Sequence, residues 1–321
     1  MFFGSARGFF TASKLDSIGR AFDIGRAPKH GKPVFMYVVT DADLDRFNRD
    51  GVVVVDQLIS PEVIQDLREA FDDLFNGVFE TGVRPDEVNW QIEGGDPTLT
   101  RQICNGWKAN RTIARVVLDA SLGEALARFA GWPGARIMQD NVIWKPVGAR
   151  SLGFHQDSAY LAWFAPSLML TCWIALDDTS AVGGTMELVR GSHRWALSEP
   201  EGEFHAPDDY RAPMRGAAER EGVEPDILPI EVPAAGGSFH HGYTWHGSGQ
   251  NCGEAPRRSL VLHAISSEVE YVPENFAKGI GPIYSRYKRL ADNQLDENYF
   301  PILWRKDGYR TPGIDVFLNA E

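Results

Sequence analysis

Apolar and polar positions near the start of the chain follow a helix–strand–helix pattern. Thr40 precedes an acidic turn, which is typical of a capped helix N-terminus. Four consecutive valines at 52–55, bounded by a glycine and an aspartate, predict a strand. Ser60 followed by Pro61 predicts a second helix start, and the apolar residues after it fall on one helical face. That face comprises Val63, Ile64, Leu67, Phe71 and Leu74.

The middle of the chain has the two-residue period of strands. In segment 168–176 one face is apolar throughout, and the other face carries Met169, Thr171, Trp173 and Ala175. This alternation predicts a strand between a hydrophobic layer and a cavity. Segments 136–145 and 185–189 are predicted strands, 110–130 is a predicted helix, and 80–110 is predicted to be loop-rich.

Two polar residues share one face of the predicted strand 136–145, namely Gln139 and Asn141. A polar side chain that points into a barrel without a partner costs about 1–3 kcal/mol. A bound oxo-acid would supply such partners, so this strand is a candidate wall of a ligand site.

Composition fits one large folded domain. The chain has 321 residues, 43% of them hydrophobic and 24% charged, with nine Trp and eighteen Phe. A net charge of −12 argues against a nucleic-acid partner. Three scattered cysteines without a C-x-x-C pair indicate a reducing compartment. No apolar run is long enough to span a membrane and no secretory signal is evident, so we expect a cytoplasmic protein with no membrane partner.

The candidate chemistry begins with His155 and Asp157, which are two residues apart. On an extended segment their side chains leave the same side of the backbone and could bind one metal ion. His246 is the candidate third ligand. Two histidines and one carboxylate form the facial triad of non-haem Fe(II) oxygenases, which leaves three coordination positions for a co-substrate and O2. An isolated His-x-Asp occurs often by chance, so this interpretation depends on further residues.

Arg257 follows His246 by eleven residues. A turn through 250–254 and a returning strand over 259–265 would bring its guanidinium back near the metal. An arginine fork binds a carboxylate through two parallel hydrogen bonds. A co-substrate that chelates iron with its oxo-acid end and presents a distal carboxylate to arginine is 2-oxoglutarate.

These residues carry a family resemblance. Together with Trp173 and the Gly-Gly-Thr-Met-Glu-Leu segment at 183–188, the pattern resembles the phytanoyl-CoA dioxygenase (PhyH) family of Fe(II)/2-oxoglutarate-dependent oxygenases, from about residue 40 to about residue 267. The resemblance implies a β-rich α+β fold, with a double-stranded β-helix (jelly-roll, cupin-like) core flanked by helices. It further implies His155, Asp157 and His246 as iron ligands and catalytic residues.

The resemblance also implies how the co-substrate is held. Arg257 and Ser248 would bind the distal carboxylate of 2-oxoglutarate, Gln139 would help to hold it, and Trp173 would line its pocket. Asn141 is a further candidate contact. The expected cofactors are Fe(II), 2-oxoglutarate and O2.

The implied reaction is, by default, hydroxylation of an unactivated C–H bond of a small organic substrate, with release of succinate and CO2. Desaturation, epoxidation and endoperoxide formation use the same core and stay open. Aromatic richness favours a hydrophobic natural product, and the acidic surface disfavours an acyl-CoA ester. Halogenases that resemble this family have a small residue in place of the carboxylate, so Asp157 disfavours halogenation. The alternative is a non-redox, metal-binding jelly-roll protein that binds or senses a ligand.

The expected organisation is an N-terminal extension (1–38) and one catalytic jelly-roll domain (39–321). That domain would contain an insertion at 194–235, placed over the barrel mouth, and an aromatic C-terminal segment at 268–321. Either terminal part could build a homodimer contact. Four more histidines need assignment: we expect His241 next to the metal ligands, His193 in a loop, and His240 and His263 in structural roles.

Overall fold

The computed structural model describes residues 34–90, 94–200, 203–273, 286–289 and 291–318. Residues Val34–Glu321 form one compact unit. The predicted N-terminal extension lies almost entirely outside the described residues. Among those that are described, no helix combines the length and apolar character that crossing a membrane requires.

The predicted helix–strand–helix opening is confirmed. Helix α1 (Asp41–Asp50) begins at Thr40, whose side chain and backbone exchange hydrogen bonds with Asp43 in a capping box. Strand β1 (Val52–Val55) follows directly. Ser60 caps a short 3-10 helix, η1 (Pro61–Val63), and helix α2 (Ile64–Phe75) continues from it. The buried face of α2 includes the leucines and Phe71 that the periodicity indicates.

The single helix expected over 110–130 is in fact two. Helix α3 (Arg111–Val117) ends at Leu118, and α4 (Ala120–Ala130) starts anew because the side chain of Asp119 accepts a hydrogen bond from the backbone N–H of Ser121. Aspartate is a strong N-cap, and here it outweighs the continuous apolar pattern. The break lets α4 cover the major sheet on its own.

Two antiparallel sheets form the core. The major sheet has the order β1–β10–β7–β12–β4–β3–β2, with β14 also paired to β4. Its remaining strands are β10 (Gly237–His241), β7 (Met169–Ala175), β12 (Arg257–Ser266), β4 (Gly134–Lys145), β3 (Arg101–Cys104), β2 (Glu87–Val88) and β14 (Ile302–Arg305). The minor sheet is β5 (Leu152–His155), β11 (His246–Ser248), β8 (Met186–Val189) and β9 (Ile227–Pro229).

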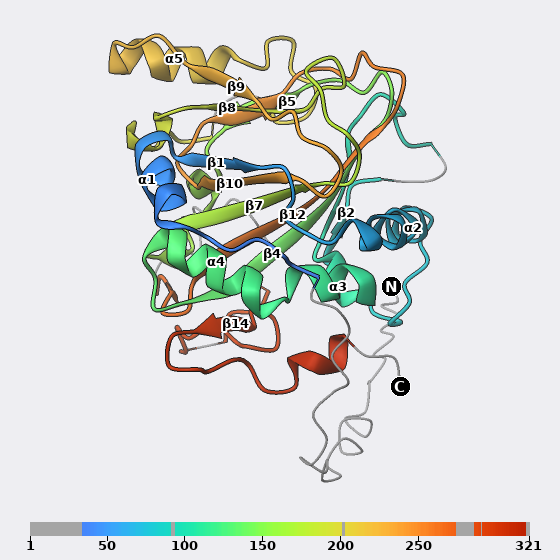
Figure 1. The fold of residues 1–321 in the computed structure, drawn as a ribbon, viewed down its shortest axis with the longest axis vertical. Coiled ribbons are helices and arrows are strands. Elements are labelled where there is room, and N and C mark those ends of the chain that lie inside the picture. The colour runs from blue at the N-terminus through green and yellow to red at the C-terminus, as the bar shows by residue number, and fades with distance from the viewer. Residues whose placement is uncertain (1–33, 91–93, 201–202, 274–285, 290, 319–321) are drawn as a thin grey trace, which may run out of the picture. The chain divides into compact units, whose positions relative to one another are not determined.

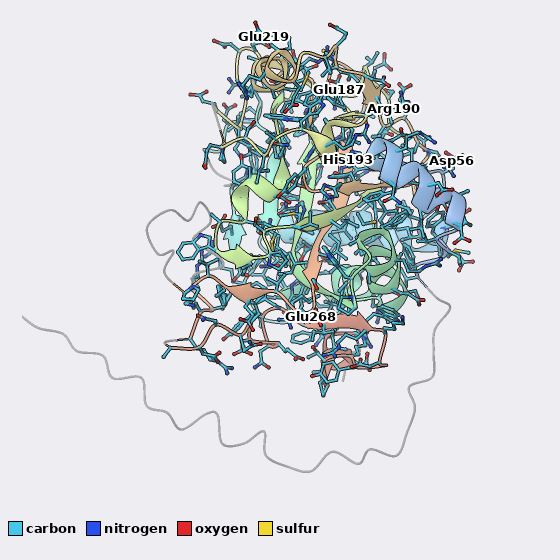
Figure 2. All side chains as sticks on the ribbon, turned by 90° about the vertical axis from the view of Figure 1, so that its left-hand side faces the viewer. Asp56, Glu187, Arg190, His193, Glu219 and Glu268 are labelled. Carbon is cyan, nitrogen blue, oxygen red and sulfur yellow. The ribbon has the colours of Figure 1, made fainter. Side chains whose placement is uncertain are left out.

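Smaller elements complete the described structure. They are the strand pair β6 (Phe164–Ala165) and β13 (Glu270–Tyr271), the helix α5 (Ala212–Glu221), and the 3-10 helices η2 (Gly106–Lys108), η3 (Asp157–Tyr160), η4 (Ser192–Arg194) and η5 (Ile314–Phe317). The expected insertion 194–235 therefore contains α5 and β9, and β9 adds a strand to the minor sheet. His193, expected in a loop, lies in η4 beside α1, where its Nε2 is 3.2 Å from the Asn48 carbonyl oxygen (Figure 2).

The strand alternation decides which side chains face the site. Figure 1 shows the helices α2, α3 and α4 along one face of the major sheet and the minor sheet over the other. Leu170, Cys172 and Ile174 of β7 belong to the core on the helical side. Thr171 and Trp173 point between the two sheets, as predicted. This is the expected jelly-roll core flanked by helices.

Candidate metal centre and co-substrate pocket

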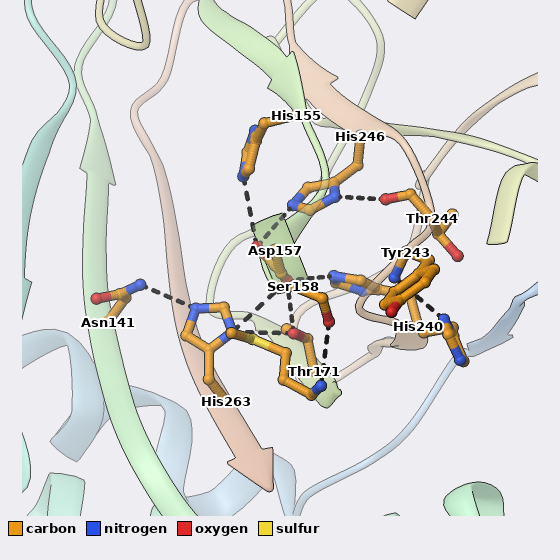
Figure 3. Close-up of polar contacts among 12 residues, drawn as sticks. Asn141, His155, Asp157, Ser158, Thr171, His240, Tyr243, Thr244, His246 and His263 are labelled. Atoms are coloured by element: carbon orange, nitrogen blue, oxygen red, sulfur yellow. Dashed lines mark hydrogen bonds and ion pairs between the residues drawn. The ribbon is translucent and has the colours of Figure 1, made fainter. Parts of the chain in front are cut away.

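His155, Asp157 and His246 form a three-residue cluster between the sheets. One ligand atom from each lies within 4.8 Å of the others. Both imidazoles place Nε2 at 3.4 Å from the same carboxylate oxygen, Oδ1 of Asp157 (Figure 3). His246 thus converges on one point with His155 and Asp157, from which it is far apart in sequence, as predicted.

The local structure that produces this convergence differs from the prediction. His155 is the last residue of β5, whereas Asp157 begins the 3-10 helix η3, so the two do not share one extended segment. Strand pairing contributes instead, because β5 and β11 are antiparallel neighbours with His155 directly opposite His246. The Cα atoms of directly opposite residues in an antiparallel pair lie about 4.5–5.5 Å apart. Side chains at this separation can bind one ion.

Each histidine is held by its other ring nitrogen. Nδ1 of His155 lies 2.9 Å from the carbonyl oxygen of Gly153, and Nδ1 of His246 lies 2.9 Å from that of Thr244. A carbonyl can only accept, so both rings carry a proton on Nδ1 and direct Nε2, the atom that would bind a metal, toward Asp157. Metal-bound histidines typically have this arrangement. The donor set therefore fits Fe(II).

The carboxylate is buried, with 6% of its residue surface exposed. Burial alone would raise the pKa of Asp157, but the neighbouring imidazoles, His246 first, outweigh burial and hold that pKa well below its usual range. Asp157 in turn raises the pKa of His246 against the effect of burial. Asp157 is therefore an anion near neutral pH, which a cation-binding ligand requires.

The structure corrects the prediction for His241 and places His240 and His263 more closely than the sequence could. His241 does not touch the cluster: its Nδ1 accepts a hydrogen bond from the backbone of Tyr243 and its ring packs near Phe47. His240 and His263, expected to be structural, lie beside the second carboxylate oxygen, Oδ2 of Asp157, at 3.4 Å and 3.6 Å. Adjacent residues of a strand point to opposite faces, and only the register of β10 decides which of His240 and His241 faces inward.

The far end of the pocket is cationic. Arg257 is 4% exposed and Lys145, which lies opposite it on β4, is 0% exposed. No carboxylate among the described residues lies within ion-pair distance of either side chain. Burial lowers the pKa of Arg257 to about 10, and burial followed by the charge of Arg257 lowers the pKa of Lys145. Two adjacent buried basic side chains, neither within ion-pair distance of a described carboxylate, indicate an anionic ligand.

Ser248 and Trp173 lie where the resemblance places them. Lys145 donates a hydrogen bond from Nζ to Ser248 Oγ (2.7 Å) and another to the Gly249 carbonyl oxygen. This contact leaves the Ser248 hydroxyl proton for a ligand. The guanidinium carbon of Arg257 lies 5.8 Å from the centre of the Trp173 ring. Trp173, Ser248 and Arg257 line the pocket directly, whereas Lys145 does not. Lys145 was not among the predicted site residues, although its place in the inward-facing pattern of strand 136–145 was a signal.

Gln139 and Asn141 do face inward, but Asn141 does not depend on a ligand for partners. Its Oδ1 accepts from Gln139 Nε2 (3.2 Å) and from Cys104 Sγ (3.1 Å), and its Nδ2 lies 3.0 Å from His263 Nε2. The inference that a bound oxo-acid must satisfy this residue is therefore unnecessary. Cys104 belongs to β3, a strand within the region expected to be loop-rich.

Between these two ends the pocket is apolar. Ile143, Trp173 and Val261 line it between the cation pair and the metal cluster. A carboxylate at one end, a short hydrocarbon span and a chelating oxo-acid at the other describe 2-oxoglutarate. The order of charge and polarity along the pocket therefore fits this co-substrate.

The cluster opens toward solvent on the side of His155. The side chain of His155 is 17% exposed, against 7% for Asp157 and 9% for His246. The rings of Phe204 and Tyr160 flank it, with centroids 4.9 Å and 6.1 Å away. A second, adjoining pocket on this side also contains Glu199 and Glu203.

Comparison with known proteins gives one matching family. The sequence model described as Phytanoyl-CoA dioxygenase (PhyH) matches residues 47–259. Among curated relatives, a phytanoyl-CoA dioxygenase domain-containing protein 1 of Danio rerio is 22% identical and covers 75% of this chain and 95% of its own. A probable alpha-ketoglutarate-dependent hypophosphite dioxygenase of Stutzerimonas stutzeri is 26% identical over 66% of this chain and 73% of its own.

Solved structures share the fold at low identity. The non-heme alpha ketoglutarate dependent carbocyclase SnoK from nogalamycin biosynthesis superposes with a TM-score of 0.65 at 20% identity, covering 85% of this chain and 99% of its own. EctD from S. alaskensis, solved with 2-oxoglutarate and 5-hydroxyectoine, gives a TM-score of 0.61 at 18% identity, covering 82% and 92%. Identities this low establish the fold alone.

Proposed function

Because the chain belongs to the phytanoyl-CoA dioxygenase (PhyH) family of Fe(II)- and 2-oxoglutarate-dependent dioxygenases, we propose that it hydroxylates an unactivated C–H bond of a small organic substrate. One observation carries this proposal. The three candidate metal ligands and the buried guanidinium of Arg257, with Lys145 opposite it on β4, lie at opposite ends of one pocket.

Each part of the pocket has a distinct task in this reaction. His155, Asp157 and His246 would hold Fe(II), and Arg257 with Ser248 would bind the distal carboxylate of 2-oxoglutarate. Trp173 would exclude water from the hydrocarbon span between them. When bound, Fe(II) with 2-oxoglutarate and O2 supplies the oxidising power for C–H hydroxylation, and the oxo-acid leaves as succinate and CO2.

The competing chemistries need a different site. A halogenating member would require a small residue where Asp157 stands, to leave a coordination position for chloride. A metal-binding sensor with the same three ligands does not need a binding site for 2-oxoglutarate. The buried Arg257 and Lys145 therefore favour the oxygenase over the sensor. Desaturation, epoxidation and endoperoxide formation would use the same residues as hydroxylation, so the products of the substrate panel below distinguish these reactions.

We assign the substrate to the exposed side of the metal cluster. Phe204 and Tyr160 flank His155 there, so an apolar or aromatic substrate would be bound well. Glu199 and Glu203 in the adjoining pocket would repel an anionic substrate such as an acyl-CoA ester. A neutral, hydrophobic natural product meets both conditions.

The proposal is tested by adding Fe(II) and 2-oxoglutarate to the purified protein without oxygen. Chelation of the metal by the oxo-acid should produce a visible charge-transfer absorption, and His155→Ala should abolish it. On admission of air, succinate should form slowly without substrate and faster with the right one. An absent absorption in the wild type, or one unchanged in His155→Ala, contradicts the assignment of the site.

A substrate panel tests the second half of the proposal. Neutral terpenoid and polyketide compounds should increase succinate formation and appear as products gaining one oxygen atom by mass spectrometry. Acyl-CoA esters serve as the matched anionic set. A clear preference for the esters would refute the substrate class and leave the co-substrate assignment intact.

A further inference from the structure

The two oxygens of the Asp157 carboxylate have different surroundings. Oδ1 faces the Nε2 atoms of His155 and His246, the proposed metal side. Oδ2 faces the protein: the hydroxyl of Thr171 donates to it over 2.7 Å, with ring nitrogens of His240 and His263 nearby (Figure 3). A carboxylate with contacts to only one oxygen could rotate about its side-chain torsions. In Asp157 both oxygens have polar neighbours.

The groups at Oδ2 form one row across the inner face of the major sheet. Thr171 on β7 is directly opposite His240 on β10 and His263 on β12. His263 is in turn directly opposite Gln139 on β4. The neighbouring inward row has Trp173 and Val261 at its centre, with Ser238 and Asn141 on either side of them. The row that contains Thr171 lies at the level of the carboxylate.

Hydrogen-bond donors run in one direction from Asn141, which lies in the neighbouring row opposite Val261, through His263 to Thr171. Asn141 Oδ1 accepts from Gln139 and Cys104, so the Asn141 amide N–H₂ faces His263 and donates to its Nε2 (3.0 Å). His263 must then carry its proton on Nδ1, which lies 2.9 Å from Thr171 Oγ1 and donates to it. The Thr171 hydroxyl has its own proton left for Asp157 Oδ2.

The backbone around Asp157 is fixed as well. Gln156 donates from its side chain to the Tyr243 carbonyl oxygen (2.9 Å), and the Ser158 N–H donates to the Gly242 carbonyl oxygen (2.9 Å). The main chain on either side of the ligand is thus tied to the segment that leads to His246. The remaining freedom of Asp157 is in its side-chain torsions, and the contacts to Oδ2 restrict them.

We propose that Thr171 is a positioning residue for the metal site, the last donor of a relay Asn141–His263–Thr171 that reserves Oδ2 of Asp157 for the protein and presents Oδ1 alone to the metal. One-oxygen binding leaves three coordination positions free, as 2-oxoglutarate and O2 require. The inference rests on the proposed function, because it assumes that the cluster binds a metal. Outer hydrogen bonds of this kind orient ligands and tune metal affinity.

The test compares variants of one side chain. Thr171→Val keeps the shape and removes the hydroxyl, whereas Thr171→Ser keeps the hydroxyl. Thr185→Val is the matched control, because Thr185 is equally buried but donates to the backbone carbonyl of Ile230, away from the metal. Apo-protein is titrated with Co(II), a coloured substitute for Fe(II), and both the visible absorption and the metal-induced rise in Tm are recorded.

We expect Thr171→Val to bind Co(II) about 10-fold to 100-fold more weakly, with altered ligand-field bands, and Thr171→Ser and Thr185→Val to bind like the wild type. Wild-type affinity in Thr171→Val, or equal losses in the Val and Ser variants, would overturn the relay. A wild type that binds no Co(II) would instead overturn the metal site, and with it the proposed function.

A second variant tests the relay in case Thr171→Val unfolds. His263→Phe retains a ring of similar size and removes the donor to Thr171, so it should also weaken Co(II) binding. Because both residues act through one oxygen, the losses in the Thr171→Val, His263→Phe double variant should not multiply. Losses that multiply would show independent action and refute the relay.

Discussion

At the scale of single residues, the negative and the basic side chains of the site lie at opposite ends of the pocket. The anion of Asp157 is surrounded by imidazoles, and at the other end Arg257 and Lys145 have no carboxylate of the described residues within ion-pair distance. Buried cations of this kind are costly unless a ligand compensates them. Arg257 and Arg258 are neighbours in sequence, yet only the first is part of the pocket; Arg258 pairs with Asp177 on the opposite side of β12.

This difference gives a prediction with a built-in control. Arg257→Ala should raise the 2-oxoglutarate concentration needed for half-maximal rate roughly 30-fold or more, because truncating one partner of a buried charge pair costs about 2–5 kcal/mol. Arg258→Ala should leave that concentration unchanged, and Fe(II) affinity should be unaffected in both. Succinate formation at varied 2-oxoglutarate provides the measurement. Equal effects of the two substitutions would place the carboxylate site elsewhere.

At the scale of elements, the pairing of two short strands sets the metal geometry. β5 and β11 bring His155 opposite His246, and β11 has Gly247 at its centre. A Cβ at this position would lie 2.5 Å from Phe154 Cδ2 and 3.0 Å from Phe154 Cα. Phe154 is buried and cannot yield, so glycine permits the close approach of the two strands.

Gly247→Ala should therefore weaken metal binding through the backbone. We expect a loss of about 1–3 kcal/mol in the free energy of unfolding from overpacking, together with a smaller Co(II)-induced rise in Tm. Gly216→Ala in α5, where the nearest atom to a new Cβ is 3.6 Å away, should instead stabilise the protein by about 0.5–1 kcal/mol. Thermal melts with and without Co(II) distinguish the two. An undiminished metal response in Gly247→Ala would mean that the strands tolerate separation.

At the scale of the whole molecule, the C-terminal segment is attached to the body of the domain by a buried polar cluster. Asp86 accepts hydrogen bonds from Lys108 Nζ (2.7 Å), from Asn105 Nδ2 (2.6 Å) and from the hydroxyl of Tyr287. Tyr287 stacks on Tyr299 with ring centroids 3.9 Å apart. This single carboxylate, just before β2, therefore connects that strand, Asn105 and Lys108 at η2, and Tyr287.

Asp86→Asn should destabilise the protein by about 3 kcal/mol, because it leaves Lys108 as a buried cation without its anion. Burial raises the pKa of Asp86, but Lys108 and Tyr287 outweigh it, so the pKa is lowered. A lowered folded-state pKa means that this stabilisation is present above about pH 4 and is lost as the pH falls through the folded pKa. Denaturant unfolding from pH 7 to pH 3 should show a steeper acid loss in the wild type than in Asp86→Asn.

The control for this prediction is the exposed pair Arg190–Asp226. Asp226→Asn should change neither the stability at neutral pH nor its acid dependence, because solvent screens a surface ion pair. If Asp86→Asn behaves like Asp226→Asn, the cluster does not anchor the C-terminal segment.

Much of the architecture follows from local sequence. Thr40, Ser60 and the alternating pattern of 168–176 predict their elements correctly, because capping and strand periodicity depend on neighbours in the chain. The helix over 110–130 was the failure at this level, since Asp119 also caps and divides it. The identity of the ligand set was likewise available, because His155, Asp157, His246 and Arg257 belong to a recognisable spacing.

Only the tertiary structure decided which side chains reach Asp157 and the co-substrate pocket. His240 and His241 are adjacent in sequence, and the register of β10 against β7 alone turns His240 inward. The register of β12 against β4 likewise places Lys145 beside Arg257. Sequence determines what each element is and which chemistry its residues offer. Strand register determines which of those residues meet, because a shift of one residue moves every side chain to the other face.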